Sequence, residues 1–244
     1  MTMWNSIRNA RALTCALVLG FFCGNVFADE QAVLKRVREK FPQSFVEKVF
    51  STPYPGMYEV LMDSKLFYTD EQVSYVLIGN LIDLKSGQNL TRERLRKLTA
   101  IDWKELPLDL AIKKVKGDGS RQLALFSDPL CPHCVTQEKE FAKLDNVTIY
   151  TFIYPIENLH KGSTALSRAV WCSSDRVKAW DDLVLNRTEP KSAPCDDPIK
   201  KIDAVGTKLK IGTTPTMIFV DGTVIVGGAF AQQIEKIFAA IAKN

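Results

Sequence analysis

The sequence predicts an α+β protein in which a charged helix connects two units. Residues 29–84 contain a helical pattern followed by several runs of strand-forming residues, which is typical of a helix packed on a small sheet. Residues 85–106 are rich in charge, and residues 107–244 alternate strand-like and helix-like segments. The length of 244 residues suits one or two domains. A net charge of +4 without a basic tract argues against nucleic acid as a partner.

Residues 1–28 have the features of a secretory signal peptide. Arg8 and Arg11 form a short basic region, an apolar run follows, and Val26-Phe27-Ala28 offers the residues that a signal peptidase reads. The apolar run is shorter than the ~20 residues that a membrane span needs. Removal of this segment takes Cys15 and Cys23 from the six cysteines of the chain. An even set is left, as is common for secreted proteins with disulfides: Cys131, Cys134, Cys172 and Cys195.

The unit at 29–84 begins with an amphipathic helix, which Asp29 can cap and Pro42 ends. The strand-like runs after it are 44–52, 57–63, 65–70 and 73–84. The last run is long and apolar, and as an open edge it invites pairing with another chain. We expect a homodimer that joins these edges, and the alternative is that the larger unit covers them.

The segment TRERLRKLTAIDWKEL, which starts at Thr91, predicts a helix with one narrow apolar stripe. Thr91 is a possible cap, and the helix should end before Pro107. A helix that is polar around most of its circumference usually bridges domains, so we expect residues 85–106 to form a linker.

The larger unit alternates strands and helices. Residues 111–115 and 122–128, with a glycine-containing turn between them, suggest a hairpin. Residues 216–220 and 223–228 suggest a second hairpin, joined by Asp221-Gly222. The other predicted elements are a helix at 132–144, a strand at 147–154, helices at 163–186 with a break near Ser173-Ser174, a helix at 198–210 and a C-terminal helix.

The motif Cys131-Pro132-His133-Cys134 lies between a predicted strand and a predicted helix. Proline suits the first helical position, so the Cys131 sulfur should face the free N–H groups and the positive end of the helix dipole. Such sites lower a cysteine pKa from about 8.5 into the range ~3.5–7.5. His133 adds a donor or a positive charge beside it. We therefore expect Cys131 to be an exposed thiolate nucleophile, with Cys134 close enough to form a disulfide with it.

Other interpretations of this motif are weaker. Structural zinc needs four Cys or His ligands, and the mature chain offers no second Cys-x-x-Cys and only His133 and His160 as histidines. We expect no metal and no cofactor. A purely structural Cys131–Cys134 bond constrains little chain. His160, in a loop-like segment, is expected to be solvated.

Cys172 and Cys195 lie in segments without an activating pattern. A bond between them stabilises the fold by roughly 3 kcal/mol on the chain-entropy model. We expect a structural disulfide, and a second redox pair is the alternative. Thr214-Pro215 stands at the start of a predicted strand, and on base rates alone its peptide bond is trans, because only ~5–6% of X-Pro bonds are cis.

The order of these motifs resembles the DsbC/DsbG group of disulfide isomerases in the thioredoxin superfamily. The resemblance covers nearly the whole mature chain: a small N-terminal domain, a charged helix, the site FSDPLCPHC, VWC at 170–172, a later loop cysteine and GTTPT at 212–216. It implies a thioredoxin-like catalytic domain at 107–244 and a cystatin-like dimerisation domain at 29–84.

The resemblance also implies roles for residues. Cys131 is then the nucleophile and Cys134 the resolving thiol, and Cys172–Cys195 is the structural disulfide. Pro215 becomes a cis-proline packed against the pair, and Thr214 presents backbone groups to an extended client peptide.

The implied activity is the isomerisation or reduction of non-native disulfides in misfolded secreted proteins, in the periplasm of a bacterium. The implied partners are a second copy of the chain and a DsbD-like membrane electron donor. The Pro-His pair is familiar from DsbA-type oxidases, so a thiol oxidase stays open as an alternative, as does a chaperone with incidental cysteines. The residue six positions before Cys131 is Leu125, where many thioredoxin-fold enzymes bury a carboxylate, and Asp128 lies nearer.

Overall fold

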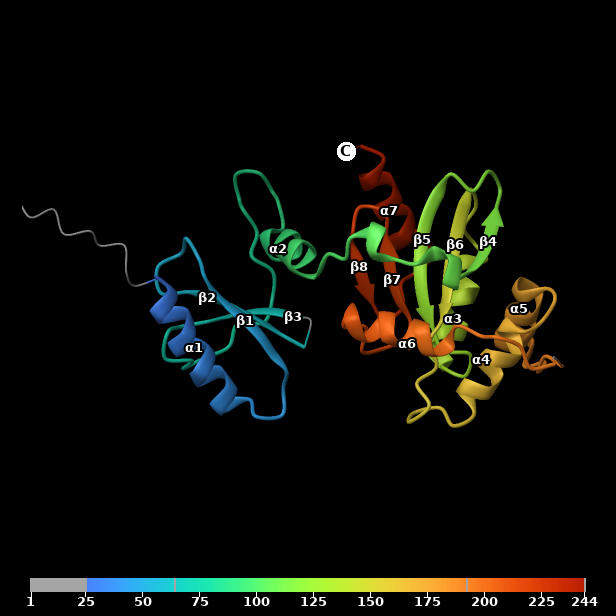
Figure 1. Cartoon of the computed structure of the whole chain (residues 1–244). Coiled ribbons are helices and arrows are strands. Elements are labelled where there is room, and N and C mark those ends of the chain that lie inside the picture. The colour runs from blue at the N-terminus through green and yellow to red at the C-terminus, as the bar shows by residue number, and fades with distance from the viewer. Residues whose placement is uncertain (1–25, 64, 192, 244) are drawn as a thin grey trace, which may run out of the picture. The chain divides into compact units, whose positions relative to one another are not determined.

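The computed structural model describes residues 26–63, 65–191 and 193–243, and it divides into two compact units between Leu81 and Ile82 (Figure 1). The expected signal peptide lies almost wholly outside the described residues. Residues 26–28 belong to the first helix, which begins three residues before the cap that we expected at Asp29. None of the helices in the described part of the chain combines the length and apolar character needed to cross a bilayer.

The first unit packs one helix on a three-stranded antiparallel sheet of order β1-β2-β3. Its elements are α1 (Val26–Lys40), β1 (Val46–Ser51), β2 (Tyr58–Met62) and β3 (Lys65–Thr69). The apolar face of α1 meets the sheet through Val33 and Val37, which are fully buried against Val60 and Phe67. These contacts remove apolar surface from water and hold the unit together.

The expected fourth strand at 73–84 is wrong. Val73 takes a left-handed conformation (φ 55°), which interrupts the extended chain, and the pairing with β3 is a bridge between Tyr68 and Leu77. The segment that follows, residues 75–84, is called the apolar segment below. It leaves large side chains in solvent, including Ile78 at 85% and Leu84 at 93% exposure.

The linker helix is shorter than expected and has a different cap. Helix α2 (Leu90–Thr99) begins after Asn89, whose side chain accepts a hydrogen bond from the Arg92 amide (2.9 Å). Asparagine caps as well as threonine does, and Thr91 lies inside the first turn. Two short 3₁₀ turns follow, at Trp103–Glu105 and Leu108–Leu110.

The second unit has a five-stranded mixed sheet of order β4-β6-β5-β7-β8. Its strands are β4 (Ile112–Lys116), β5 (Arg121–Ser127), β6 (Val147–Ile153), β7 (Thr216–Phe219) and β8 (Val224–Val226). The expected β7–β8 hairpin is confirmed. The expected hairpin of β4 and β5 is wrong, because β6 lies between them, antiparallel to β4 and parallel to β5.

The turn between β4 and β5 explains how this order arises. Gly117 has a positive φ of 58°, and a Cβ atom there would lie 2.2 Å from Asn146 Oδ1. The glycine therefore lets the chain pass close over Asn146, which immediately precedes β6, so that β5 begins on the far side of β6. Strand β6 is buried on both faces and takes an interior place, whereas β4 buries one face and forms the edge.

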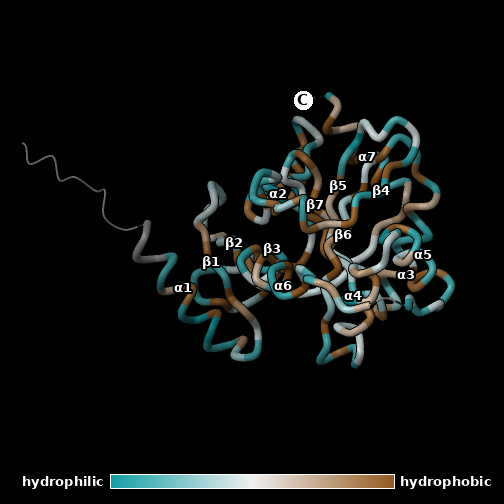
Figure 2. The backbone as a smooth tube through the Cα atoms, turned by 45° about the vertical axis from the view of Figure 1, so that its right-hand side comes forward, coloured by the Kyte–Doolittle hydropathy of each residue, from teal (hydrophilic) through white to brown (hydrophobic). Residues whose placement is uncertain are grey.

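Helices cover both faces of this sheet (Figure 1). Leu123 and Leu125 of β5 point to one face, under α3 (Pro132–Phe141) and α7 (Ala231–Ile241). Ala124 and Phe126 point to the other face, which α4 (Ser163–Trp171), α5 (Arg176–Asn186) and α6 (Ile199–Lys208) cover. Hydrophobic and hydrophilic residues alternate along these helices in Figure 2, as expected of helices with one buried face. The α+β class expected from the sequence is confirmed.

Candidate active site

The cysteine motif occupies the junction between the central strand β5 and helix α3. Cys131 is the residue immediately before the helix, with extended backbone angles (φ −68°, ψ 121°), and Pro132 takes the first helical position. The Cys131 carbonyl accepts hydrogen bonds from the amides of Cys134 (3.1 Å) and Val135 (3.2 Å). The Cys131 side chain is therefore attached at the positive end of the α3 dipole, where negative charge is stabilised.

The Cys131 side chain is more enclosed than we expected. The residue is only 4% exposed, so the expectation of an exposed sulfur is wrong. Its sulfur lies 3.6 Å from the carbonyl oxygen of Thr214, and the Thr214–Pro215 peptide bond is cis. The segment before β7 thus packs directly against the sulfur and covers it. Cys134 is the deeper of the two, with no exposed surface, and both thiols are free.

Burial raises the pKa of the Cys134 thiol to about 12. Removal from water is the largest cause, because it disfavours the charged thiolate. The hydroxyl of Ser127, the backbone N–H of Asp128 and the hydroxyl of Thr214 act in the opposite direction but do not outweigh it. Cys134 is therefore held in its protonated form at neutral pH.

His133 projects from the first turn of α3 into solvent. Its imidazole makes no hydrogen bond or ion pair with any residue in the described ranges. It therefore stands at the rim of the site, where an incoming molecule would meet it.

Asp128 and His160, which the sequence analysis did not connect with each other, lie close together near the motif. Asp128 is fully buried, and its carboxylate accepts hydrogen bonds from the amides of Leu130 (2.8 Å) and Ile156 (2.6 Å). His160 Nδ1 lies 3.1 Å from the Asp128 Oδ2 atom. The expectation that His160 is a solvated loop residue is wrong, since its side chain is only 22% exposed. The available signal was Asp128 itself, a carboxylate directly after an apolar strand.

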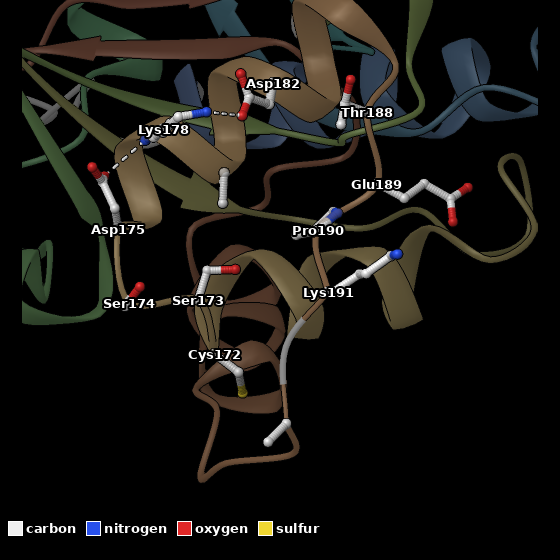
Figure 3. A pocket seen from close by; sticks show the side chains of 12 residues that line it. Cys172, Ser173, Ser174, Asp175, Lys178, Asp182, Thr188, Glu189, Pro190 and Lys191 are labelled. Carbon is white, nitrogen blue, oxygen red and sulfur yellow. Dashed lines mark hydrogen bonds and ion pairs between the residues drawn. The ribbon is translucent and has the colours of Figure 1, made fainter.

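Cys172 and Cys195 form a disulfide away from the cysteine motif, with their Cα atoms 5.6 Å apart. Cys172 ends helix α4, and Cys195 lies in the exposed loop before α6. A surface hollow of about 470 Å³ adjoins Cys172. Figure 3 shows its walls, with Lys178 bonded to Asp182 and with Glu189 and Lys191 directed outward. Because the walls carry charges of both signs, the hollow has no single electrostatic preference.

Two family models match the chain. Residues 24–92 match the disulfide bond isomerase protein N-terminal domain, and residues 108–242 match the thioredoxin-like domain. A solved structure, a disulfide interchange protein from Neisseria gonorrhoeae, shares 37% identity and a TM-score of 0.53. The match covers 55% of this chain and 97% of that one.

Curated relatives extend the similarity to most of the chain. A probable thiol:disulfide interchange protein DsbC of Bordetella pertussis is 42% identical over 203 residues, which cover 82% of this chain and 72% of the relative. DsbC of Escherichia coli is 25% identical over 214 residues, with 86% and 87% covered. The resemblance found in the sequence is thereby confirmed. The chain belongs to the DsbC family of thiol:disulfide interchange proteins, enzymes that act on proteins containing disulfides.

Proposed function

We propose that the chain isomerises or reduces non-native disulfides through Cys131 as the attacking thiol and Cys134 as the resolving thiol. This assignment depends on the different surroundings of the two sulfurs, which differ in solvent exposure and in their position relative to the start of α3. Cys131 stands at the positive end of the α3 dipole and is 4% exposed to solvent. Cys134 is fully buried, and the pKa of its thiol is raised to about 12. A nucleophile needs access and stabilised charge, and Cys131 has both in greater measure.

The reaction begins when the Cys131 thiolate attacks one sulfur of a client disulfide. A bond forms between Cys131 and that sulfur, and the other client sulfur leaves as a thiolate that takes up a proton. In isomerisation a client thiolate attacks the mixed disulfide and displaces Cys131. A new client disulfide forms, and no electrons are gained or lost overall.

In reduction Cys134 gives up its proton and attacks the sulfur of Cys131. A Cys131–Cys134 disulfide forms, and the client leaves with both of its thiols, reduced by two electrons. The high pKa of Cys134 slows this step, because the protonated thiol is a poor nucleophile. The mixed disulfide therefore lasts long enough for client thiols to rearrange, which favours isomerisation over reduction.

The bend before β7, which lies against Cys131, supports a role for Thr214 and Pro215 in holding the client. Thr214 already offers its carbonyl to the Cys131 sulfur. A client strand aligned along this segment brings its own disulfide to the same sulfur. Because the backbone at Thr214-Pro215 covers the Cys131 sulfur, this backbone must shift locally when a client docks.

Refolding of a protein with scrambled disulfides tests the assignment. Cys131→Ala should reduce the rate to that of the uncatalysed reaction, and Cys134→Ser should retain part of the isomerisation but lose reduction. Cys172→Ala with Cys195→Ala is the matched control for loss of cysteines, and it should keep the activity at temperatures where it is folded. A Cys131→Ala variant that refolds the substrate at the normal rate contradicts the proposal and supports a chaperone with incidental cysteines.

A thiol oxidase is the second candidate, and the Pro132-His133 pair favours it. His133 is an exposed residue of the motif, and a positive charge near an attacking sulfur in general makes a thiol pair more oxidising. The redox state of the pair in cells distinguishes the two activities. A mostly reduced Cys131–Cys134 pair supports the isomerase, and a mostly oxidised pair supports the oxidase.

We further propose that two copies of the chain associate through their N-terminal units. The part of the apolar segment that belongs to the first unit, residues 75–81, supports this, because large exposed apolar surfaces usually mark interfaces. Ile78→Asp should convert a dimer to a monomer in light scattering after size exclusion. Phe45→Asp, at a side chain 64% exposed on the same unit but outside the apolar segment, is the control and should stay dimeric.

The proposed setting is the periplasm, with misfolded secreted proteins as clients. The signal-like residues 1–28 and the Cys172–Cys195 disulfide support an oxidising compartment. Each reductive cycle leaves an oxidised pair, so a donor must return two electrons. A DsbD-like membrane protein is the proposed donor, and deletion of such a donor should leave Cys131–Cys134 oxidised in cells.

A further inference from the structure

The backbone of Asp128 contacts both cysteines of the motif. Its carbonyl accepts the Cys131 amide (3.2 Å), and its own N–H stabilises the Cys134 sulfur. Any shift of Asp128 therefore changes the surroundings of both sulfurs together. The position of this residue is set by its side chain, because a fully buried carboxylate must satisfy its charge with nearby donors.

Two backbone N–H groups and one imidazole nitrogen surround that carboxylate, and they come from two loops. Leu130 belongs to the motif loop, while Ile156 and His160 belong to the loop between β6 and α4. His160 Nδ1 stands at ion-pair distance from Oδ2, though not aligned as a hydrogen bond, and it has no other partner in the described part of the chain. Asp128 is thus the group that faces the Nδ1 side of the imidazole.

The second loop is itself rigid. The His160 amide donates to the Ile156 carbonyl (2.9 Å), and the His160 carbonyl accepts the Ser163 amide (3.0 Å). Glu157 accepts hydrogen bonds from the amides of Gly162 and Thr164. The Thr164 hydroxyl, followed by these two amides, lowers the pKa of Glu157 to about 2. These hydrogen bonds attach the loop to the start of α4 and hold the His160 imidazole next to Asp128.

We propose that His160 is a positioning residue for the dithiol site, acting through the Asp128 carboxylate on the backbone that contacts Cys131 and Cys134. This inference rests on the proposed function of the pair. The imidazole stabilises the negative carboxylate and so reduces the negative potential that the two sulfurs experience. Its removal disfavours the thiolate form of the reduced pair, which makes the pair more reducing.

His160→Leu and His160→Asn test this together. Leucine removes the imidazole nitrogen, whereas the side-chain amide nitrogen of asparagine stands close to where Nδ1 stands and restores a polar group there. For His160→Leu we expect the equilibrium constant with glutathione to shift about tenfold toward the disulfide, equivalent to about 30 mV. The isomerisation kcat should fall about tenfold with little change in KM. His160→Asn should stay within about twofold of the unmodified chain in both measurements, since it keeps a polar contact to the carboxylate.

A double-mutant cycle tests the route of the effect. Asp128→Asn keeps the shape of the side chain and removes its charge, so His160→Leu should shift the equilibrium little further in that background. Leu159→Ala, at a neighbouring side chain that is 71% exposed, is the matched control and should be unchanged.

Equal losses in His160→Leu and His160→Asn overturn the proposal, because they indicate a packing role only. An unchanged glutathione equilibrium in His160→Leu, with Cys131→Ala inactive, overturns this inference and leaves the proposed function standing. Activity in Cys131→Ala overturns both. If His160→Leu does not fold, the His160→Asn result decides, and a tenfold shift there contradicts the proposal.

Discussion

The buried thiol of Cys134 gives a quantitative prediction for its reactivity. Its pKa is raised from 9.0 to about 12, chiefly by desolvation. Each pKa unit changes the ratio of thiolate to thiol tenfold, so at pH 8 Cys134 is about 10³-fold less ionised than an ordinary cysteine. Since only the thiolate reacts with alkylating agents, Cys134 should react at least that much more slowly.

Alkylation by iodoacetamide between pH 7 and pH 11, followed by mass spectrometry, measures this directly. In a chain of residues 29–244, Cys131→Ser leaves Cys134 as the unbonded cysteine, because Cys172 and Cys195 are bonded to each other. The neighbouring Cys131 is one of the smaller causes of the raised pKa, so its loss should change little. The rate should rise about tenfold per pH unit over the whole range, because the pKa lies above it.

The same variant in denaturant is the control, and its rate should level off near the ordinary pKa of a cysteine. A plateau near pH 9 in the folded variant would contradict this prediction, because it would mean that burial does not raise the Cys134 pKa. The resolving role would then lose its physical basis.

Three further predictions concern the second unit and are measured by denaturant unfolding. Burial raises the pKa of Glu138, so the unfolding free energy should fall as pH rises above about 4.5, where the unfolded carboxyl ionises first; Glu138→Gln should remove this slope. Lys116 donates to three carbonyls at the C-terminal end of α3, and Lys116→Met should lower the unfolding free energy by about 2 kcal/mol. Joint replacement of Cys172 and Cys195 by alanine should lower it by roughly 3 kcal/mol. Each prediction would be contradicted if the variant unfolded with the same free energy, and the same pH dependence, as the unmodified chain.

Helix starts and tight turns were predicted correctly from the sequence where residues within the helix or turn determine its backbone conformation. Pro132 at the first turn marked the start of α3, and Asp221-Gly222 marked the β7–β8 turn. Both signals are short-range, because they set backbone angles within a few residues. The placement of Cys131 immediately before a helix follows from them.

Strand order was not predictable in the same way. The β4 and β5 segments are separated by a glycine turn that looks like a hairpin, but Asn146 and β6 lie between them. Which strand fills the centre of a sheet depends on long-range burial, and the turn itself holds no information about it. The prediction of a strand at 73–84 was wrong for a related reason. Apolar residues alone do not determine whether a segment pairs with a neighbouring strand.

In the candidate site too, short-range features were predictable from the sequence and long-range contacts were not. The cysteines and Thr214-Pro215 belong to compact motifs, whereas Asp128 and His160 meet across 32 positions. A single histidine in a polar loop has no local feature that distinguishes it from a solvated one. Its role depends on a buried carboxylate that only the fold brings to it.

The proposed chemistry requires Cys131 to be the sulfur that attacks the client. Cys134→Ser stops the reductive escape, so clients should accumulate as mixed disulfides with the chain. Peptide mapping by mass spectrometry should locate those clients on Cys131. Clients attached to Cys172 or Cys195, or no covalent adduct at all with a disulfide-containing substrate in excess, would show that Cys131 is not the attacking sulfur.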